Sequence, residues 1–226
     1  LESSFSTAEK SETKGDRRLV IYGAGGHGRS LAALVRSCYD FEVVGFIDDG
    51  KPVGAAIDDL PVLGGADYLD QLAHKGITQA INGVGGISDL PARLEVYHQL
   101  AKTGFFCPTV VHKTAFIEEN AVLSDGVQVF PFAYVGISVN VGYGCIINTG
   151  TIVSHDCKLA PYVNLSPGAT LAGGVTIGEA ALIGMQATVN LNVKIGARAR
   201  VGNGATVKAD VPEGGIVPAG TIWPPR

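Results

Sequence analysis

The sequence predicts an α/β N-terminal half-Rossmann (βαβ) domain followed by a parallel β-helix of hexapeptide repeats. Three observations support this prediction. Short apolar runs alternate with helical patterns up to residue 108, and an aliphatic residue then recurs at every sixth position. Gly accounts for 31 of 226 residues, about twice its usual frequency of about 7%. A repetitive, turn-rich structure explains that excess.

Four segments are expected along the chain. Residues 1–16, "LESSFSTAEKSETKGD", are polar with little to bury, so we expect a disordered tail or a linker from a longer polypeptide. Residues 17–108 form the βαβ domain and 109–212 the β-helix. Residues 213–226 form a C-terminal segment.

The composition favours a small-molecule partner. A net charge of -4 without any run of Lys and Arg gives no electrostatic footprint for nucleic acid or an anionic membrane. No apolar run approaches the roughly 18 residues of a membrane span, and the first residues lack the layout of a signal peptide. The four Cys show no CxxC pairing, so reduced thiols are expected. We therefore expect a cytoplasmic protein.

The βαβ domain is expected to contain three strands and three helices in alternation. The strands are 19–23 (LVIYG), 42–49 (EVVGFIDD) and 77–85 (ITQAINGVG), and the helices are 28–39, 66–76 and 90–104. This alternation predicts a parallel sheet covered by helices. About ninety residues hold one mononucleotide-binding half of a doubly wound fold, whereas a dinucleotide fold needs two.

A glycine-rich loop follows the first strand. "GAGGHG" fits GxGxxG at Gly23, Gly25 and Gly28, with Gly26 inside the motif. Bare N–H groups at a helix N-terminus bind phosphate. The motif alone suggests NAD, but the domain has half the required size, so a nucleoside diphosphate carrying a sugar fits better.

Other polar residues of this domain are candidate ligands of the nucleotide-sugar. Asp48 and Asp49 end the second strand about twenty residues after the loop, a spacing that suits a ribose or a base. His27 lies inside the loop, where it either contacts a phosphate or the sugar or only caps the helix. Asn82, at the end of "ITQAIN", is a further candidate.

The second half of the chain has a period of six. Stepping by six from Val111 to Val207 meets only Val, Ile or Leu, at seventeen consecutive positions. The residue two places earlier is mostly small, and Gly often follows the aliphatic residue. Strand alternation points the aliphatic and the small residue inward, and Gly tolerates the corner. Three such edges, eighteen residues, close one coil of a parallel β-helix.

"SHDC" contributes the candidate catalytic base. His155 lies two residues beyond inward-facing Val153, so its ring should project outward from a corner. Asp156 is placed to fix the tautomer of the imidazole and to stabilise its protonated form. A general base that takes a proton from an amine or a hydroxyl contributes about 10² to 10⁴ in rate. The alternative is a solvated corner histidine.

The eighteen-residue period predicts what lies beside this base. His155, Gly173 and Leu191 should stack in one column, about 4.8 Å apart. The N–H of Gly173, without a side chain in the way, could hold the oxyanion of a reacting acyl group; the alternative is a tight corner. Cys145 and Cys157 occupy small inward positions, so packing explains them.

The motifs "GAGGHG", "FIDD", "NTGTIVSHDC" and "SPGATLAGGVTIG" together resemble the sugar O-/N-acyltransferase family of left-handed β-helix acetyltransferases. That family includes nucleotide-amino-sugar N-acetyltransferases of the bacillosamine and perosamine type and sialic acid O-acetyltransferases. The resemblance implies a left-handed β-helix, a homotrimer, and acetyl-CoA as co-substrate, bound along the column of Gly173 and Leu191.

The resemblance also implies roles for individual residues. The His of the matching motif is the base, which assigns this role to His155 with Asp156 orienting it. Asn148 corresponds to a polar residue near the sugar; its alternative is a corner turn. Relatives commonly carry a second His nine residues after the base, where this chain has Asn164. Asn can donate to a carbonyl but cannot accept a proton.

The function we expect is an acetyl-CoA-dependent N-acetyltransferase acting on the amino group of a nucleotide-linked amino sugar, of the UDP-4-amino-dideoxy type. Two alternatives stay open: a sugar O-acetyltransferase of the sialic acid type, and a non-catalytic β-helix scaffold. We expect no metal, because a zinc site of the carbonic anhydrase kind needs three imidazoles and the repeat region holds only His112 and His155.

Overall fold

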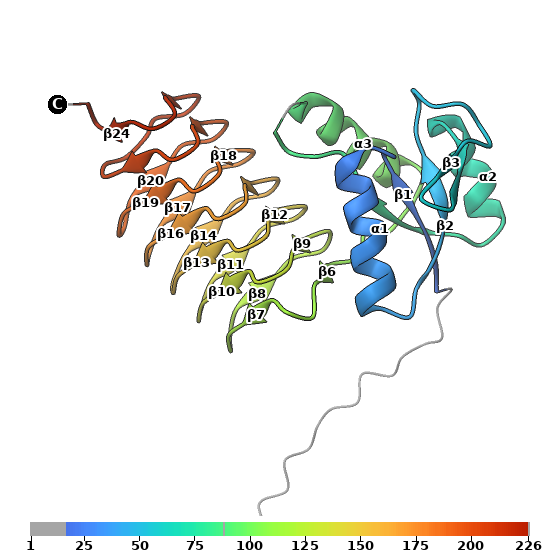
Figure 1. Ribbon diagram of the computed structural model, residues 1–226, viewed down its shortest axis with the longest axis horizontal. Coiled ribbons are helices and arrows are strands. Elements are labelled where there is room, and N and C mark those ends of the chain that lie inside the picture. Colours follow the sequence, from blue (N-terminus) through green and yellow to red (C-terminus); the bar gives the residue numbers. More distant parts are fainter. Residues whose placement is uncertain (1–16, 88, 226) are drawn as a thin grey trace, which may run out of the picture.

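The computed structural model describes residues 17–87 and 89–225 and shows an α/β domain followed by a three-sided β-helix (Figure 1). The predicted tail, residues 1–16, lies outside the described residues. Three parallel sheets of two-residue strands, typical of a left-handed β-helix, form the prism. The predicted fold class is confirmed. No helix in the described part of the chain is both long and apolar enough to cross a bilayer.

The N-terminal domain contains one five-stranded sheet in the order β3-β4-β2-β1-β5. Its strands are β1 (Arg18–Tyr22), β2 (Glu42–Ile47), β3 (Ala56–Ile57), β4 (Leu60–Gly64) and β5 (Gln79–Asn82). All neighbours pair in parallel except β3 with β4. The hairpin of β3 and β4 was not predicted, because a two-residue strand and a five-residue strand containing Pro61 carry no clear alternation.

The helices of this domain lie near their predicted positions. They are α1 (Gly26–Cys38), the 3-10 turn η1 (Ala66–Tyr68), α2 (Leu69–His74) and α3 (Leu90–Lys102). Helix α1 buries Leu31, Leu34 and Val35, which lie on one face of the helix. Helix α3 begins at Leu90, directly after the N-cap residue Asp89, whose carboxylate accepts from the N–H of Ala92.

The prism has three sheets, each made of strands from successive coils. Sheet I consists of β6 (Val110–Val111), β9 (Gln128–Val129), β12 (Ile146–Ile147), β15 (Asn164–Leu165), β18 (Leu182–Ile183), β21 (Arg200–Val201) and β23 (Ile216–Val217). Sheet II consists of β7 (Phe116–Ile117), β10 (Tyr134–Val135), β13 (Ile152–Val153), β16 (Thr170–Leu171), β19 (Thr188–Val189), β22 (Thr206–Val207) and β24 (Ile222–Trp223). Sheet III consists of β8 (Val122–Leu123), β11 (Asn140–Val141), β14 (Lys158–Leu159), β17 (Thr176–Ile177) and β20 (Lys194–Ile195).

The register follows the sequence period. Val135 pairs with Val153 and Val153 with Leu171, so successive coils are eighteen residues apart. The aliphatic positions of the period fill the interior, and the small inward residues, such as Cys145 and Ala169, are fully buried beside them. Burial of this continuous apolar column is the main favourable contribution to the stability of the prism.

The β-helix continues through the segment that we had separated as 213–226. Strand β23 pairs with β21 and β24 with β22, with Val201 opposite Val217 and Val207 opposite Trp223. The last coil is therefore two residues shorter than the others. The indole N–H of Trp223 donates to the carbonyl of Asp210 at 3.0 Å, which closes the end of the column.

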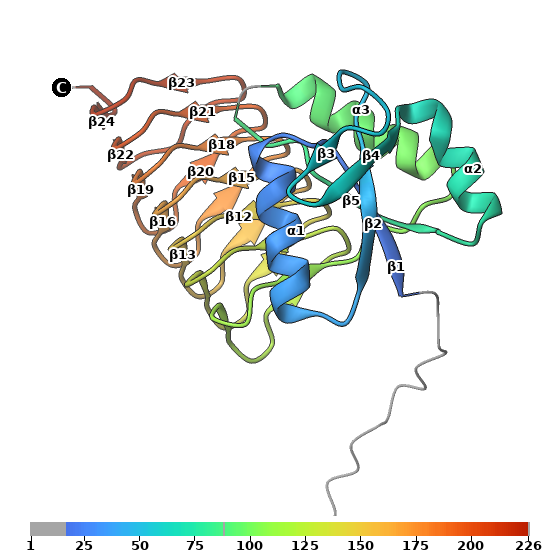
Figure 2. The same cartoon turned by 45° about the vertical axis from the view of Figure 1, so that its right-hand side comes forward.

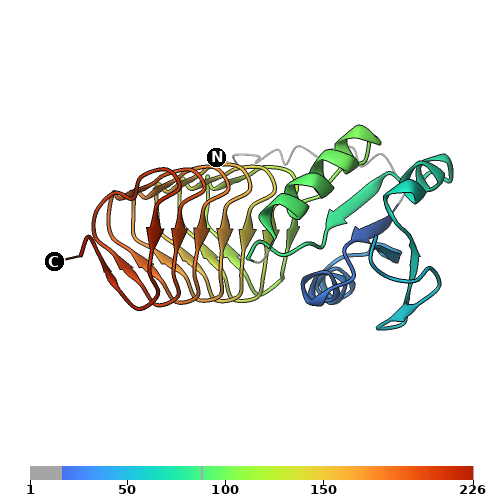
Figure 3. The same cartoon turned by 90° about the horizontal axis from the view of Figure 1, so that it is seen from above.

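The N-terminal domain packs on the outer face of sheet I, as Figure 2 shows for α1. The outward residues Val110 and Ile146 and the corner residue Phe130 are buried in one cluster with α1. The hydroxyl of Tyr39 accepts from the N–H of Val111 at 2.6 Å. Viewed from above, the domain covers one side of the prism near its first coils (Figure 3).

Arg93 of α3 connects the two domains through backbone carbonyls, and it forms no ion pair with a carboxylate of the described residues. Its side chain is fully buried and donates to the carbonyls of Gly144 and, at 3.1 Å, of Tyr162. Both carbonyls belong to corners between sheets III and I. The guanidinium also lies 5.8 Å from the ring centroid of Tyr97. A charged donor thus satisfies corner carbonyls that the domain contact removes from water.

We expect Arg93→Ala to destabilise the protein by about 3 kcal/mol, because it removes two hydrogen bonds from a charged donor at about 1.5 kcal/mol each. Urea unfolding measures this as a lower midpoint. Arg36→Ala, on the exposed side of α1, is the matched control and should stay within about 0.5 kcal/mol of the parent. Equal midpoints for the two variants would contradict the role of Arg93.

Candidate functional site

His155 lies at a corner between sheet II and sheet III, after β13 and before β14. Its ring projects outward and is 58% exposed. Nδ1 lies 2.8 Å from Oδ2 of Asp156. Because a carboxylate only accepts, Nδ1 carries the proton of the neutral ring and Nε2 keeps its lone pair. Asp156 takes the left-handed conformation, with φ 60°, which turns its carboxylate back to the ring.

Gly173 lies directly under the imidazole of His155, one coil further along the prism. A Cβ at this position would come within 2.4 Å of Cε1 and 2.5 Å of Nε2, so a larger residue would displace the ring. The Gly173 N–H donates no hydrogen bond to any residue that the structure describes. The coils are joined on either side: Gly174 N–H donates to the carbonyl of His155, and Asn192 N–H to that of Gly173.

This corner can therefore act on an acyl group. Nε2 of His155 can accept a proton from an attacking group, and the free N–H of Gly173 can donate to the carbonyl oxygen under attack. Leu191, in the next coil, is 61% exposed and offers an apolar surface in the same column.

The glycine loop is tightly wound at one end and open in the middle. Gly23 has φ 109°, and a Cβ on Gly28 would lie 1.9 Å from the Gly23 carbonyl oxygen. By contrast, a Cβ on Gly25 or Gly26 would meet nothing within 4 Å. Gly25 is the N-cap of α1, so the open space lies at the start of a helix of thirteen residues, where anions are favoured.

We expect Gly28→Ala to destabilise the N-terminal domain by about 3 kcal/mol, because the methyl group overlaps the Gly23 carbonyl. Gly26→Ala, which meets open space, is the matched control and should change stability by less than about 0.5 kcal/mol. Calorimetric unfolding of the two variants checks this. A stable Gly28→Ala protein would contradict the close approach of helix and loop.

The two aspartates at the end of β2 hold the protein's own backbone. Asp48 accepts from the N–H groups of Ala24 at 2.8 Å and Gly50 at 3.0 Å. Asp49 accepts from the Tyr22 hydroxyl at 2.6 Å and from an N–H of η1. Burial and this contact with Asp49 raise the pKa of Tyr22. Asp49 stays exposed, so its remaining lone pairs are open to a ligand beside the loop.

Asn82, expected as a ligand residue, is instead committed to the fold. Its side chain is buried, donates to the Arg93 carbonyl at 2.9 Å and accepts from the N–H of Val84 at 3.0 Å. Its carbonyl accepts from the amide of Gln128 at 2.7 Å. The other side of the Gln128 amide, Oε1, lies 2.8 Å from Nε2 of His27. The sequence did not predict the contacts of Gln128 with Asn82 and His27. Gln128 is an outward residue of a repeat strand, and the repeat does not indicate which part of the chain packs against that side of the sheet.

The two other asparagines lie apart from His155. Asn148 is half-buried at a corner between sheets I and II, where its Oδ1 accepts from the N–H of Thr149. Asn164 is buried in sheet I, directly beneath the loop after β5, because a Cβ on Gly86 would lie 2.6 Å from Asn164 Oδ1. Its small amide leaves room for that loop.

Most of the site residues predicted from the sequence thus form two groups, which include neither Asn82 nor Asn148. The loop Gly23–Gly28 and Asn164 lie where the N-terminal domain meets sheet I, and Asp48 and Asp49 follow the neighbouring strand β2. His155, Asp156, Gly173 and Leu191 line the corner of sheets II and III, which is the prism edge opposite sheet I. One chain does not bring the two groups together.

The buried thiols are unsuited to nucleophilic chemistry. Burial raises the pKa of Cys145 to about 12 and also raises that of Cys157. Each sulfur lies against a carbonyl oxygen of the next coil, at 3.1 Å and 3.2 Å. In the described part of the chain no cluster of three or more His, Cys, Asp or Glu could hold a metal ion.

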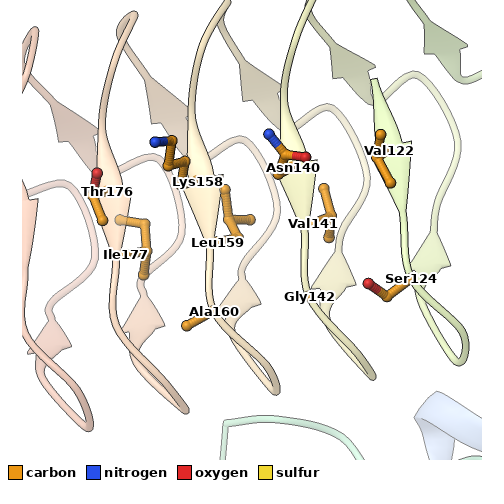
Figure 4. Close-up of a pocket in the computed structure, with 10 residues that line it drawn as sticks. All are labelled: Val122, Ser124, Asn140, Val141, Gly142, Lys158, Leu159, Ala160, Thr176 and Ile177. Atoms are coloured by element: carbon orange, nitrogen blue, oxygen red, sulfur yellow. The ribbon is translucent and has the colours of Figure 1, made fainter. Parts of the chain in front are cut away.

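A shallow groove of about 430 Å³ runs along sheet III (Figure 4). Its floor is formed by outward residues of four successive coils, Val122, Asn140, Lys158 and Thr176, and by neighbouring residues of the same strands. None of the predicted site residues lines it. The groove lies next to the corner that holds His155, because Lys158, one of its lining residues, is the first residue of β14, the strand after that corner.

Both domains match known protein families. The family model for the PglD N-terminal domain matches residues 18–100, and the model for the bacterial transferase hexapeptide (six repeats) matches residues 174–209. Among solved structures, a variant of perosamine N-acetyltransferase from Caulobacter crescentus, in complex with CoA and GDP-perosamine, is 30% identical with a TM-score of 0.84. The match covers 88% of this chain and 92% of that chain.

Two further structures are similar over nearly the same length. The acetyltransferase domain of PglB from Neisseria gonorrhoeae, in complex with acetyl coenzyme A, is 30% identical with a TM-score of 0.81, covering 90% of this chain and 97% of that one. WeeI from Acinetobacter baumannii is 27% identical with a TM-score of 0.79, covering 88% and 94%. The chain belongs to the family of acetyl-CoA-dependent sugar acetyltransferases that join a PglD-type N-terminal domain to a left-handed β-helix of hexapeptide repeats.

Proposed function

We propose that this protein transfers the acetyl group of acetyl-CoA to the amino group of a nucleotide-linked amino sugar, of the UDP-4-amino-dideoxy type. The observation that carries the proposal is the arrangement of His155 over Gly173: a base with a free Nε2 beside an unused N–H donor. The relatives solved with CoA and GDP-perosamine, or with acetyl coenzyme A, support the same chemistry.

The reaction needs only proton transfer and carbonyl polarisation from the protein. The amine nitrogen attacks the thioester carbonyl carbon while Nε2 of His155 accepts a proton from it. The negative charge on the carbonyl oxygen is stabilised by the N–H of Gly173. The new C–N bond stays, the C–S bond breaks, and the imidazolium returns its proton to the sulfur of CoA. Asp156 stabilises the imidazolium and holds the ring in place.

We propose that the active enzyme is a homotrimer in which the substrate bridges two copies. The glycine loop and His155 lie on opposite sides of one prism, so a nucleotide-sugar bound at the loop of one copy reaches the base of another. The first coils of sheet II favour such a contact, because the outward residues Phe116 and Ile152, on either side of Tyr134, are 62% and 42% exposed. Neighbouring exposed apolar residues are typical of interaction surfaces.

A cytoplasmic location is part of the proposal. All four cysteines are free thiols, three of them buried, as is usual in a reducing compartment.

Thermal unfolding with UDP, GDP, CMP or NAD, followed by a thiol-release assay with acetyl-CoA and an amino-sugar acceptor, tests the function. A nucleoside diphosphate at 100 times its Kd stabilises the protein by about 2.7 kcal/mol, and we expect UDP to do so. Stabilisation by NAD alone would overturn the assignment of the loop.

The thiol-release assay tests the reaction. Thiol release with sugar hydroxyls but not with amines would assign an O-acetyltransferase. Failure to bind CoA at millimolar concentration would favour a non-catalytic scaffold.

A further inference from the structure

The buried amide of Gln128 has only one possible orientation. The Asn82 carbonyl can only accept, so the Gln128 group 2.7 Å from it is the NH₂. Gln128 Oε1 therefore faces Nε2 of His27 at 2.8 Å. Reversing the amide would oppose two acceptors at the Asn82 carbonyl. Because Gln128 is 1% exposed, water cannot satisfy that reversed arrangement.

This orientation fixes the protonation of His27. An amide oxygen only accepts, so Nε2 of His27 donates and carries a proton. Burial, together with the nearby Arg93 guanidinium, lowers the pKa of His27 to about 4, although the hydrogen bond to Gln128 acts in the opposite direction. At neutral pH the ring is therefore uncharged, with its lone pair on Nδ1.

The free lone pair of His27 remains within reach of a ligand. Nδ1 of His27 makes no hydrogen bond within the described part of the chain. It is not one of the buried atoms that lack a partner, because among the described residues only Arg93 Nε is such an atom. Nδ1 is therefore accessible from outside. The ring is held on its other sides, since it packs on Phe130 at a centroid distance of 5.4 Å. Gly25 and Gly26, beside it in the loop, leave open space.

We infer that His27 is a specificity-determining hydrogen-bond acceptor, which binds a hydroxyl or N–H of the sugar part of the nucleotide-sugar through Nδ1, and that Gln128 is the residue that positions it. The inference rests on the proposed function for the identity of the ligand. A phosphate oxygen is not the partner of Nδ1, because both atoms accept. The loop N–H groups hold the diphosphate, and His27 selects a donor next to it, such as a hydroxyl of the sugar.

The first test measures the tautomer in the ligand-free protein. We expect ¹⁵N–¹H correlation spectra at pH 7 to show His27 with a protonated Nε2 and an unprotonated Nδ1, with the signals assigned by their loss in His27→Phe. A protonated Nδ1, in either the other tautomer or the imidazolium, would overturn the inference. Gln128→Glu is expected to place a carboxylate beside the ring and to produce the imidazolium at the same pH.

The second test measures ligand binding and catalysis. UDP-linked amino sugar should shift the Nδ1 resonance of His27 and bind about tenfold more weakly to His27→Phe, while UDP alone binds both proteins alike. Gln128→Leu should raise the KM for the nucleotide-sugar about tenfold and leave kcat and the KM for acetyl-CoA unchanged. His98→Phe, exposed on α3, is the matched control.

The outcomes separate this inference from the proposed function. An unmoved Nδ1 resonance in a protein that binds the nucleotide-sugar, or equal affinities of parent and His27→Phe, rejects the role of His27 and leaves the acetyltransferase proposal intact. Absence of any nucleotide-sugar binding rejects the proposed function, and the ligand role of His27 with it, even if the tautomer is as expected.

Discussion

Replacing His155 with Ala is expected to lower kcat by about 10² to 10⁴, the usual contribution of a general base. The substitution removes Nε2, which is the basic atom next to the free N–H of Gly173. The side chain is more than half exposed, so the free energy of unfolding should stay within about 0.5 kcal/mol of the parent. Thiol release at saturating acetyl-CoA and acceptor measures the effect on kcat.

His98→Ala is the matched control for this variant, because it removes another exposed imidazole, from α3 of the N-terminal domain. It should retain full activity. His155→Ala should also keep the oligomeric state of the parent in analytical ultracentrifugation, which separates a catalytic defect from an assembly defect. Parental turnover by His155→Ala would remove this residue from the mechanism.

Gly173→Ala is expected to lower kcat about 10²-fold although it removes no titratable group. The added methyl group would lie 2.4 Å from Cε1 of His155, so the ring must move, and a displacement of about 1 Å costs about 10² in rate. Steady-state kinetics should show this loss mainly in kcat, with circular dichroism and the unfolding midpoint near those of the parent.

A double variant isolates the cause of that loss. If Gly173→Ala acts by displacing the imidazole, then His155→Ala combined with Gly173→Ala should be no slower than His155→Ala alone. Gly204→Ala is the control for the cost of a methyl group at a corner, since a Cβ there meets nothing within 4 Å and only its φ of 64° opposes the change. Additive losses in the double variant would show that the methyl group harms catalysis by another route.

Much of the fold followed from local pattern. The aliphatic residues are six positions apart, and each edge of the prism holds one of them. Three edges therefore make a coil of eighteen residues. The same period places His155 above Gly173 before any coordinates are considered. The hairpin β3-β4 and the shorter last coil did not follow, because neither repeats and neither carries alternation long enough to identify a strand.

The contacts of the candidate ligand residues in the N-terminal domain could be predicted only in part. The glycine motif locates a loop at a helix N-terminus, since the residues that shape it are adjacent in sequence. Asn82 shows the limit: a polar residue at a strand end looks the same whether it faces a ligand or holds the next loop. The roles of Gln128 and Arg93 depend on residues 46 and 51 positions away, so no local pattern reveals them.

The sequence by itself determined the two domain types, the coil period, and the pairing of His155 with Asp156 and Gly173, because each of these depends on short, regular spacing. Only the tertiary structure decided which side of the prism the N-terminal domain covers, and hence that the glycine loop and His155 lie on opposite sides of one chain. The physical reason is that docking depends on the match between two assembled surfaces. Val110, Gln128, Ile146 and Asn164 form such a surface only after coils eighteen residues apart have stacked.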